Sequence, residues 1–500
     1  MFIFRICDPN KFSCIAHVGF NHPWRSLERG LIPHKMIAPR KSREEEVILI
    51  DHYAAEQIDR HVPLHIRLEL DGWARSFYTH EAHMNAIKSY NKPKLPPPSD
   101  TAWSQTLQHT RTIFNRLPKV NTIPYTEMDR VKWVRSSAAG YGYTGLKGEG
   151  DNYEKARKTA FTLAEMLHHD PGYGVTALLN QTPDVAFTRT QLCQIKVKRK
   201  VRNVWGEAFH HVLLEGLFAD ALIKMFAEQD TFYFIGRDPL LSVPLLIAEI
   251  LSEYDYVYMF DWSGFDATVQ EWEIRFAFEC LESLIKFPSN VERDIWHFII
   301  ELFIYRLIAA PDGTIYLKTM GIPSGSCFTN IVGSIVNYIR IQYLFKRLTD
   351  DWAHVFTHGD DSLAGVKTIQ YVPMANFGSI CNEFLWAINL DKSRVSNQIR
   401  EIGFLSREVR ELQHNRDELV CLRMLKFPEY EVENGGVSTL RAYSIFRDAG
   451  VQSRYLFKIY KSLNIKYGKA EFLPLKQRNW NPIEYELLRQ SRSEENLYLD

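Results

Sequence analysis

The sequence predicts a protein of the α+β class, because its central part combines short antiparallel strands with long helices. The run that starts at residue 254 is apolar and aromatic, which is typical of a strand buried on both faces. Residues 356–366, FTHGDDSLAGV, have the form of a hairpin that turns at Gly359 and Asp360. Apolar residues at helical spacing predict a helix over 326–345, between these two segments in the chain.

The composition is that of a globular protein with room for several domains. The chain has 500 residues, of which 45% are hydrophobic and 24% charged, so a disordered chain is excluded. Its 60 Lys and Arg balance 60 Asp and Glu, so any basic surface for a nucleic acid must be local. Seven cysteines without metal or disulfide spacing favour reduced thiols in an intracellular protein. The apolar start of the chain is interrupted by charges, which predicts neither a signal peptide nor a membrane span.

Three segments ahead of the buried strand are informative. Residues 91–100 contain four prolines, which predicts an extended connector. Residues 135–150 contain five glycines, which predicts a flexible loop where backbone can approach a ligand, with a plain surface loop as the alternative. Residues 194–206 alternate cations with valine and isoleucine, so they are expected to form a strand or hairpin that binds phosphates or a solvated basic edge strand.

Aspartates follow the predicted buried strand and lie in the turn of the predicted hairpin. Asp261 closes the buried run, and Asp266 precedes a helical pattern over 268–285. A charge at the end of a buried strand needs a partner, and both a metal ion and a structural salt bridge fit Asp261. The Gly-Asp-Asp tripeptide is weak evidence alone, but Mg²⁺ takes carboxylate oxygens together with substrate phosphates. Asp261 beside Asp360 and Asp361 therefore predicts a site for two metal ions.

A small-residue loop leads into the predicted helix. The loop GIPSG, residues 321–325, is followed by Ser326, which is the expected N-cap. Thr329, Gly333 and Asn337 are spaced by four and form a small polar stripe on the helix. Such a stripe fits either contact with a ligand or close packing of this helix against another helix.

In chain order these features are a basic segment, D-x4-D, S-G-x3-T opening a helix, and G-D-D in a hairpin. The set resembles the palm and fingers motifs of viral RNA-dependent RNA polymerases over about residues 135–410. RSSAAGYG, KVRNVWG, GIPSGSCFTNIVGSIVN and HGDDS are similar to segments of polymerases from small bisegmented double-stranded RNA viruses of the partitivirus type, with picobirnaviruses as near relatives. The resemblance implies a right-hand fold with fingers, an antiparallel palm sheet and a thumb.

The resemblance also implies the chemistry, which is attack of a 3′-hydroxyl on the α-phosphate of a nucleotide with release of pyrophosphate. Asp261 and Asp360 are expected to coordinate two Mg²⁺ ions, with Asp361 in support and Mn²⁺ as an alternative ion. Lys392 occupies the place of a lysine that protonates pyrophosphate in the family, and a solvated lysine is the alternative. The expected activity is that of an RNA-directed RNA polymerase that replicates and transcribes a viral double-stranded RNA genome.

Further residues are assigned to nucleotide and RNA by the same resemblance. The family pattern has an asparagine for the ribose 2′-hydroxyl at the position of Gly333, so sugar selection is expected to depend on Asp266 and Ser324, with Asn330 or Asn337 as a substitute. The expected nucleotide-binding residues are Lys198, Lys200, Arg202, Asp266, Ser324, Thr329 and Asn330, and the expected RNA-binding residues are Ser136, Ser137, Gly140, Gly325, Ser406 and Arg407.

The expected domains follow from the family. They are an N-terminal extension contributing to the fingers (1–95), fingers (96–209 and 269–318), palm (210–268 and 319–409) and thumb (410–500). The expected partners are template RNA, nascent RNA, nucleoside triphosphates and a viral capsid protein, with no membrane, and the expected locations are the virion interior and the host cytoplasm.

Two other readings compete with this one. A reverse transcriptase shares the palm but normally carries a bulky aromatic residue at the place of Asp266. An inactive polymerase-fold protein that only binds RNA is expected to lack metal ligands, whereas Asp261, Asp360 and Asp361 are all present.

Overall fold

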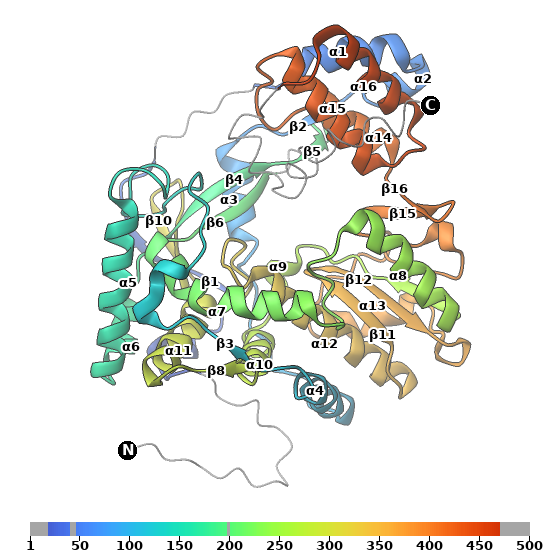
Figure 1. Ribbon diagram of the computed structural model, residues 1–500. Helices are drawn as coiled ribbons and strands as arrows, with labels where there is room; N and C mark the ends of the chain where they lie inside the picture. Colours follow the sequence, from blue (N-terminus) through green and yellow to red (C-terminus); the bar gives the residue numbers. More distant parts are fainter. Residues whose placement is uncertain (1–18, 41–46, 198–200, 471–500) are drawn as a thin grey trace.

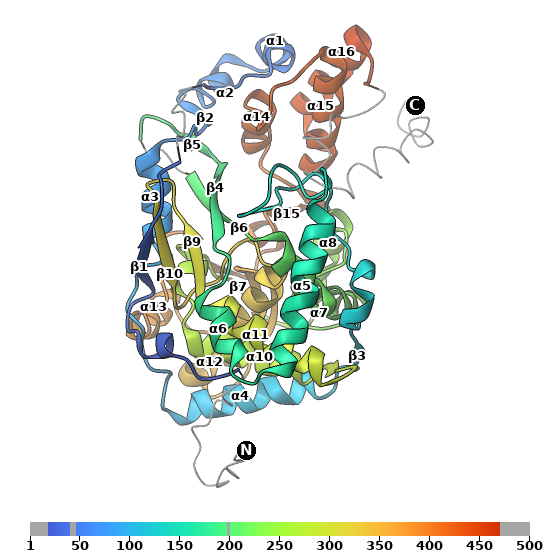
Figure 2. The same ribbon diagram turned by 90° about the vertical axis from the view of Figure 1, so that its left-hand side faces the viewer.

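The computed structural model describes residues 19–40, 47–197 and 201–470 of the chain (Figures 1 and 2). One of its two larger sheets is antiparallel and has the strand order β11-β12-β7-β13. The predicted buried strand and the predicted hairpin are both confirmed, and they pair with each other, with Ala364 opposite Tyr258. The strands of this sheet are β7 (Tyr256–Met259), β11 (His354–His358), β12 (Asp361–Val366) and β13 (Arg394–Ser396).

Helices cover both faces of this four-stranded sheet. The ring of Tyr258 contacts Phe345 of α12 (Thr329–Thr349) and Phe377 of α13 (Met374–Glu383). Val257 and Met259 join an apolar cluster on the other face with residues of α8 (Pro239–Glu253). Since successive side chains of a strand point to opposite faces, strand β7 is apolar throughout, and the charged Asp261 stands just beyond its end.

Two details of the predicted helices are wrong. Ser326 is not the N-cap of α12, because the helix starts at Thr329 with Phe328 in the cap position and no side-chain cap. The helix predicted over 268–285 is α10 (Glu271–Glu282), which is shorter at both ends, and a separate short helix, α9 (Phe265–Thr268), precedes it. A capping box, in which Gln270 and Glu273 bond each other's backbone, starts the second helix afresh.

The second large sheet has five strands in the order β1-β10-β9-β4-β6. Strand β4 pairs parallel to β9, with Asp184 opposite Ile308, and the other neighbours are antiparallel. The sheet therefore joins three distant parts of the chain and places β6, which follows the basic segment, at its edge. Its strands are β1 (Leu31–Met36), β4 (Asp184–Thr190), β6 (Val201–Gly206), β9 (Arg306–Ala309) and β10 (Thr314–Lys318).

His22 and Arg25, near the start of the described chain, are bound to the core through a buried carboxylate. Glu301 of α11 (Asn290–Ile304) is fully buried and accepts hydrogen bonds from His22 at 2.9 Å and from Arg275 at 2.9 and 3.0 Å. Arg25 also pairs with its carboxylate. Burial alone would raise the pKa of Glu301, but the hydrogen bonds from His22 and Arg275 and the charges of Arg275 and Arg25 lower that pKa to about 2.

This lowered pKa predicts an acid-sensitive contribution to stability. A carboxyl whose folded pKa lies below its unfolded value stabilises the fold above the unfolded pKa, and the contribution is lost as the pH falls toward the folded pKa. Glu301→Gln should therefore lower the free energy of unfolding by about 3 kcal/mol at pH 7, and the difference should shrink between about pH 4.5 and 2. Urea unfolding of both proteins across this range tests it, and a difference that does not change with pH would contradict it.

Residues from the two ends of the chain form one helical unit. Figures 1 and 2 show α1 and α2 beside α14, α15 and α16 at one end of the molecule. Ala54 and Ile58 share an apolar cluster with Leu422 and Ile459, and the buried Asp51 accepts a hydrogen bond from Ser438 at 2.9 Å. The sequence predicted that residues 1–95 form an N-terminal extension that contributes to the fingers, and that assignment stays a prediction. The helices are α1 (His52–His61), α2 (Leu64–Leu68), α14 (Glu418–Lys426), α15 (Gly435–Ala449) and α16 (Arg454–Tyr467).

The remaining elements surround the two large sheets. The proline-rich connector 91–100 contains no helix or strand beyond an isolated bridge at Pro93, as predicted. No helix within the described ranges has the length and apolar character needed to span a bilayer. The other elements are η1 (Pro23–Ser26), β2 (Trp73–Arg75), α3 (His80–Lys88), α4 (Thr101–Phe114), β3 (Val120–Asn121), η2 (Tyr125–Arg130), α5 (Asn152–His169), α6 (Tyr173–Leu179), β5 (Leu192–Gln194), α7 (Phe209–Glu228), β8 (Ile285–Lys286), η3 (Thr368–Gln370), η4 (Ile399–Glu401), β14 (Gly403–Phe404), β15 (Arg407–Arg410) and β16 (Gln413–Asn415).

Candidate active site

The predicted carboxylates lie at neighbouring strand ends. Ala364 faces Tyr258 in the antiparallel pair β12–β7, so continuing the register places Asp361 opposite Asp261. Asp360 precedes Asp361 in the hairpin turn, where His358 pairs with Asp361 across the turn. Gly359 has a φ of +60°, a left-handed conformation that glycine adopts without strain. The fold thus brings all three predicted metal-binding residues to one edge of the sheet.

The pKa shifts of the aspartates agree with their placement close to one another. Desolvation by the surrounding residues, and then the charges of Asp360 and Asp261, raise the pKa of Asp361 to about 7. Asp361 is exposed at the surface, so solvent screens these charges in part. Desolvation raises the pKa of Asp266 to about 6, with Asp360 adding to the shift and Arg202 opposing it. Asp266 therefore belongs to the same electrostatic cluster as the strand-end carboxylates.

The basic strand meets this cluster, as the sequence led us to expect. Arg202 on β6 lies 3.7 Å from Asp266, measured from Nη2 to Oδ2, and more than half of its side chain is exposed. The contact joins the five-stranded sheet to α9, the short helix that follows β7. Lys198 and Lys200, which were predicted to act with Arg202, lie outside the described residues.

The loop ahead of α12 is pressed against β6. A Cβ atom on Gly325 would stand 1.8 Å from the carbonyl oxygen of Trp205, so only glycine fits there. The hydroxyl of Ser324 faces the carbonyl of Asn203 at 3.4 Å. Thr329 donates to the carbonyl oxygens of Pro323 and Ser326, both at 2.9 Å. Ser324 and Gly325 therefore lie beside the strand that carries Arg202, while the hydroxyl of Thr329 bonds the loop itself.

The polar stripe on α12 supports the hairpin turn. Asn337 is fully buried, and its amide nitrogen donates to the carbonyl oxygens of Gly359 at 3.0 Å and Asp361 at 3.3 Å. Its amide oxygen accepts from Trp262 at 2.9 Å, and Trp262 directly follows Asp261. Ser334 accepts a hydrogen bond from the backbone of Gly359 at 2.8 Å. Asn337 thus bonds the hairpin turn rather than a second helix, and contact of the stripe with a ligand, including a ribose, stays a prediction.

These supporting roles were missed at the level of sequence. A buried asparagine on an otherwise apolar helix requires partners, and that requirement was the available signal for Asn337. Asn330, predicted to bind nucleotide, accepts a hydrogen bond from Tyr233 at 2.8 Å, and its amide nitrogen lies beside Gly359. Asn330 is thus adjacent to the hairpin turn, and its nucleotide role stays a prediction.

The glycine-rich segment 135–150 is more ordered than the predicted flexible loop. Ala138 bridges to Leu146, and Lys147 donates from its backbone to Ser137 and from its side chain to the hydroxyl of the same serine at 2.9 Å. A Cβ on Gly140 would stand 2.5 Å from the carbonyl oxygen of Glu207, so this glycine allows the loop to approach the end of β6. Ser136, Ser137 and Gly140 thus share a folded turn, and RNA contact by them stays a prediction.

The other predicted residues lie at two places. Lys392 is exposed and comes just before Ser393, whose hydroxyl accepts from the backbone of Asp261 at 2.9 Å. Ser406 is exposed at a tight turn with a φ of +61°. Arg407 pairs with Asp448 of α15, so its guanidinium already links this turn to the helical unit. RNA contact by Ser406 and Arg407 stays a prediction.

Among the described residues, no three His, Cys, Asp or Glu side chains already converge on a point that could hold a metal ion. The carboxylates nevertheless fit Mg²⁺, which usually binds through one or two carboxylates and completes its coordination with waters and substrate phosphates. Their mutual repulsion, seen in the raised pKa of Asp361, is what a bound cation would offset. The cysteines are also as expected, because those in the described ranges are free.

An antiparallel sheet with acidic strand ends, flanked by an arginine on a second sheet, is the arrangement of a right-hand nucleic-acid polymerase. The sequence model for viral RNA-dependent RNA polymerases matches residues 49–464, so the chain belongs to this family. The resemblance inferred from the sequence motifs is therefore confirmed.

Individual relatives agree with the family. The chain is 32% identical over 191 residues to the RNA-directed RNA polymerase of Cryptosporidium parvum virus 1 (strain KSU-1). That match covers 35% of this chain and 34% of the relative, so the chain aligns with about a third of that protein's length.

Solved polymerase structures share the fold. The Sicinivirus 3Dpol RNA-dependent RNA polymerase aligns with a TM-score of 0.67 at 15% identity, covering 93% of this chain and 98% of that one. The RNA-dependent RNA polymerase of a human picobirnavirus aligns with a TM-score of 0.64 at 15% identity, covering 90% and 94%. The predicted right-hand α+β fold is confirmed.

Proposed function

We propose that this chain is an RNA-directed RNA polymerase that copies and transcribes a viral double-stranded RNA genome. The observation that carries the proposal is the meeting of Asp261 with the Asp360–Asp361 turn at one sheet edge, with Asp266 and Arg202 beside them. Asp261 and Asp360 are the proposed ligands of two divalent cations, Mg²⁺ or Mn²⁺. Asp361 supports them from the neighbouring position in the hairpin, directly after Asp360.

When bound, Mg²⁺ would lower the pKa of the primer 3′-hydroxyl and neutralise charge on the triphosphate. The side chains of this chain then have positioning tasks. Arg202 holds the triphosphate, Ser324 and Gly325 contact the template and nascent base pair, and Lys392 donates a proton to pyrophosphate as it leaves. Contacts through glycine and serine backbone suit an enzyme that must copy any sequence.

Template-dependent incorporation of nucleotides in Mg²⁺ tests this function directly. The wild-type chain should extend an RNA copy when ribonucleotides are supplied and should do so poorly with deoxyribonucleotides. Preference for deoxyribonucleotides would favour the reverse-transcriptase reading. A folded wild-type protein that binds RNA but incorporates neither substrate would favour an inactive binding protein.

Sugar selection can be tested at Asp266. The ion pair with Arg202 holds the Asp266 carboxylate beside the strand-end acids, where it can accept a hydrogen bond from a ribose 2′-hydroxyl. Asp266→Ala should lower the ratio of kcat/KM for a ribonucleotide over the matching deoxyribonucleotide about ten-fold, the effect of one such bond. Asp255→Ala, at the opposite end of β7, is the control, and an unchanged ratio in Asp266→Ala would remove Asp266 from this role.

The proposal includes the domain boundaries of the chain, its partners and its location. We assign the palm to 210–268 and 319–409, the fingers to 96–209 and 269–318, and the thumb to 410–500. Residues 51–70 pack with α14–α16, which supports counting them with the thumb. Template and nascent RNA, nucleoside triphosphates and a viral capsid protein are the proposed partners, in the virion interior and the host cytoplasm.

A further inference from the structure

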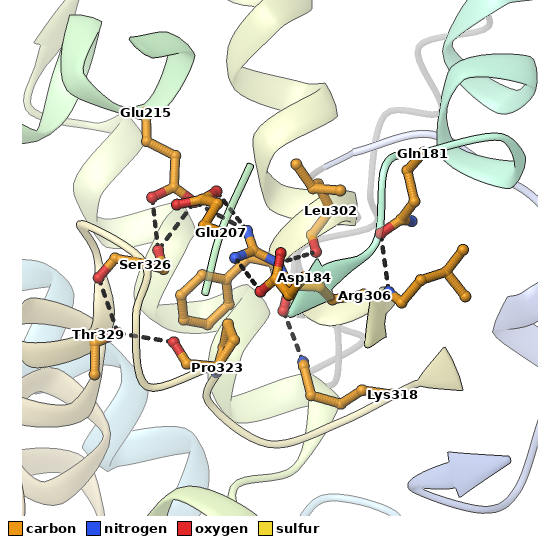
Figure 3. Close-up of polar contacts among 12 residues, drawn as sticks. Gln181, Asp184, Glu207, Glu215, Leu302, Arg306, Lys318, Pro323, Ser326 and Thr329 are labelled. Atoms are coloured by element: carbon orange, nitrogen blue, oxygen red, sulfur yellow. Dashed lines mark hydrogen bonds and ion pairs between the residues drawn. The ribbon is translucent and has the colours of Figure 1, made fainter. Parts of the chain in front are cut away.

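A buried arginine gathers three carboxylates beside the candidate site (Figure 3). Arg306 of β9 is 1% exposed, and its guanidinium lies 3.3 Å from Asp184, 3.1 Å from Glu207 and 3.0 Å from Glu215. Each carboxylate is also buried, and each comes from a different element, β4, the end of β6 and α7 respectively. One side chain therefore connects the second sheet to α7.

Glu215 carries this connection to the loop ahead of α12. Its carboxylate accepts hydrogen bonds from the hydroxyl of Ser326 at 2.8 and 2.9 Å and from the backbone of Cys327 at 2.7 Å. The same hydroxyl accepts a bond from the backbone of Phe328 at 3.1 Å. Both carboxylate oxygens of Glu215 thus accept hydrogen bonds from the loop, and the side chain is fully buried.

The opposite side of the same loop is fixed by β6. Gly325 touches the carbonyl of Trp205 so closely that no side chain would fit, and Ser324 faces Asn203. Residues 323–327 are therefore held between β6 on one side and Glu215 on the other. Figure 3 shows the contact of Glu215 with this loop at Ser326. A loop held on both sides keeps Ser324 and Gly325 at a defined distance from Arg202.

We propose that Glu215 is a positioning residue that sets the loop 323–327 for recognition of the nascent base pair. This inference rests on the polymerase function proposed above. A role in stability alone is the alternative, but the contacts of Glu215 with Ser326 and Cys327 are directed at a loop with a proposed substrate role. Burial, and in addition the charge of Glu215, raises the pKa values of Asp184 and Glu207, and the charge of Arg306 opposes this rise.

Two variants and their combination test the inference in the full-length chain. Glu215→Gln keeps the shape of the side chain and removes its charge, and Ser326→Ala removes the hydroxyl and leaves the Arg306 cluster intact. Glu301→Gln is the matched control, since Glu301 is an equally buried partner of an arginine that contacts no residue of this loop. The measurements are KM and kcat for a correct nucleotide, the misincorporation ratio and the thermal midpoint.

Glu215→Gln and Ser326→Ala should each raise KM and the misincorporation ratio about ten-fold, which is the effect of losing one charge-assisted hydrogen bond. The double variant should be no worse than the single ones, because both changes break the same link. Glu301→Gln should lower the thermal midpoint without changing fidelity. The inference is overturned if the misincorporation ratio of Glu215→Gln equals that of Glu301→Gln. It is also overturned if Ser326→Ala has the KM and the misincorporation ratio of the wild type. This second outcome decides the question even if Glu215→Gln does not fold. Absence of incorporation by the wild type would instead overturn the proposed function.

Discussion

Replacing Asp360 by alanine should lower nucleotide incorporation at least ~10³-fold without reducing the stability of the fold. A metal ion contributes several kcal/mol to a phosphoryl-transfer transition state, and ~10³-fold corresponds to about 4 kcal/mol. Asp360 is exposed at the tip of the hairpin, and its charge raises the pKa of both Asp361 and Asp266. Its removal relieves this repulsion, so the thermal midpoint should stay constant or rise.

The control for Asp360 is Asp255→Ala. Asp255 is an exposed aspartate at the other end of β7, where it accepts hydrogen bonds from Thr368 at 2.7 and 2.8 Å. This variant should lose a little stability and retain incorporation. Incorporation and thermal unfolding are measured for both variants, with Mg²⁺ and Mn²⁺ in turn. If Asp360→Ala retained more than a tenth of wild-type activity with either ion, Asp360 would not be the metal ligand.

The strands of the candidate site could be predicted because their signals are local. The apolar run before Asp261 and the Gly-Asp-Asp turn each contain within a few residues the pattern that defines them. Antiparallel pairing then leaves few ways to arrange them, and the register places Asp361 opposite Asp261. The ion pair between Arg202 and Asp266 was not predicted, although the family motifs contain both residues.

The features that the sequence did not predict depend on contacts between residues far apart in the chain. Ser326 has the sequence pattern of an N-cap, but Glu215, more than a hundred positions earlier, takes its hydroxyl, and α12 starts three residues later. The packing of residues 51–70 against α14–α16 likewise depends on contacts between the two ends of the chain. Local propensity gives no information about partners at that separation, so the sequence did not predict this packing.

Replacing Asn337 should have the second large effect on activity, because this fully buried side chain joins the two acidic segments. Its amide bonds the backbone on both sides of Asp360, and it also holds the indole of Trp262, the residue after Asp261. Asn337→Ala would leave a buried N–H and two carbonyl groups without their partner, at a cost of about 3 kcal/mol. The distance between Asp261 and the hairpin would no longer be fixed, and a shift of about 1 Å at such a site costs roughly 10²-fold in kcat.

Gln342 separates loss of stability from loss of positioning. It lies on the same helix, is equally buried, and bonds the backbone of Ala353 at 2.8 and 3.1 Å, ahead of β11 and away from the carboxylates. Gln342→Ala should therefore lower the thermal midpoint by a similar amount and leave kcat near the wild-type value when both are assayed well below their midpoints. Equal losses of kcat in the two variants would mean that Asn337 only stabilises α12. A loss confined to Asn337→Ala would mean that the spacing of the acidic loops depends on one buried amide.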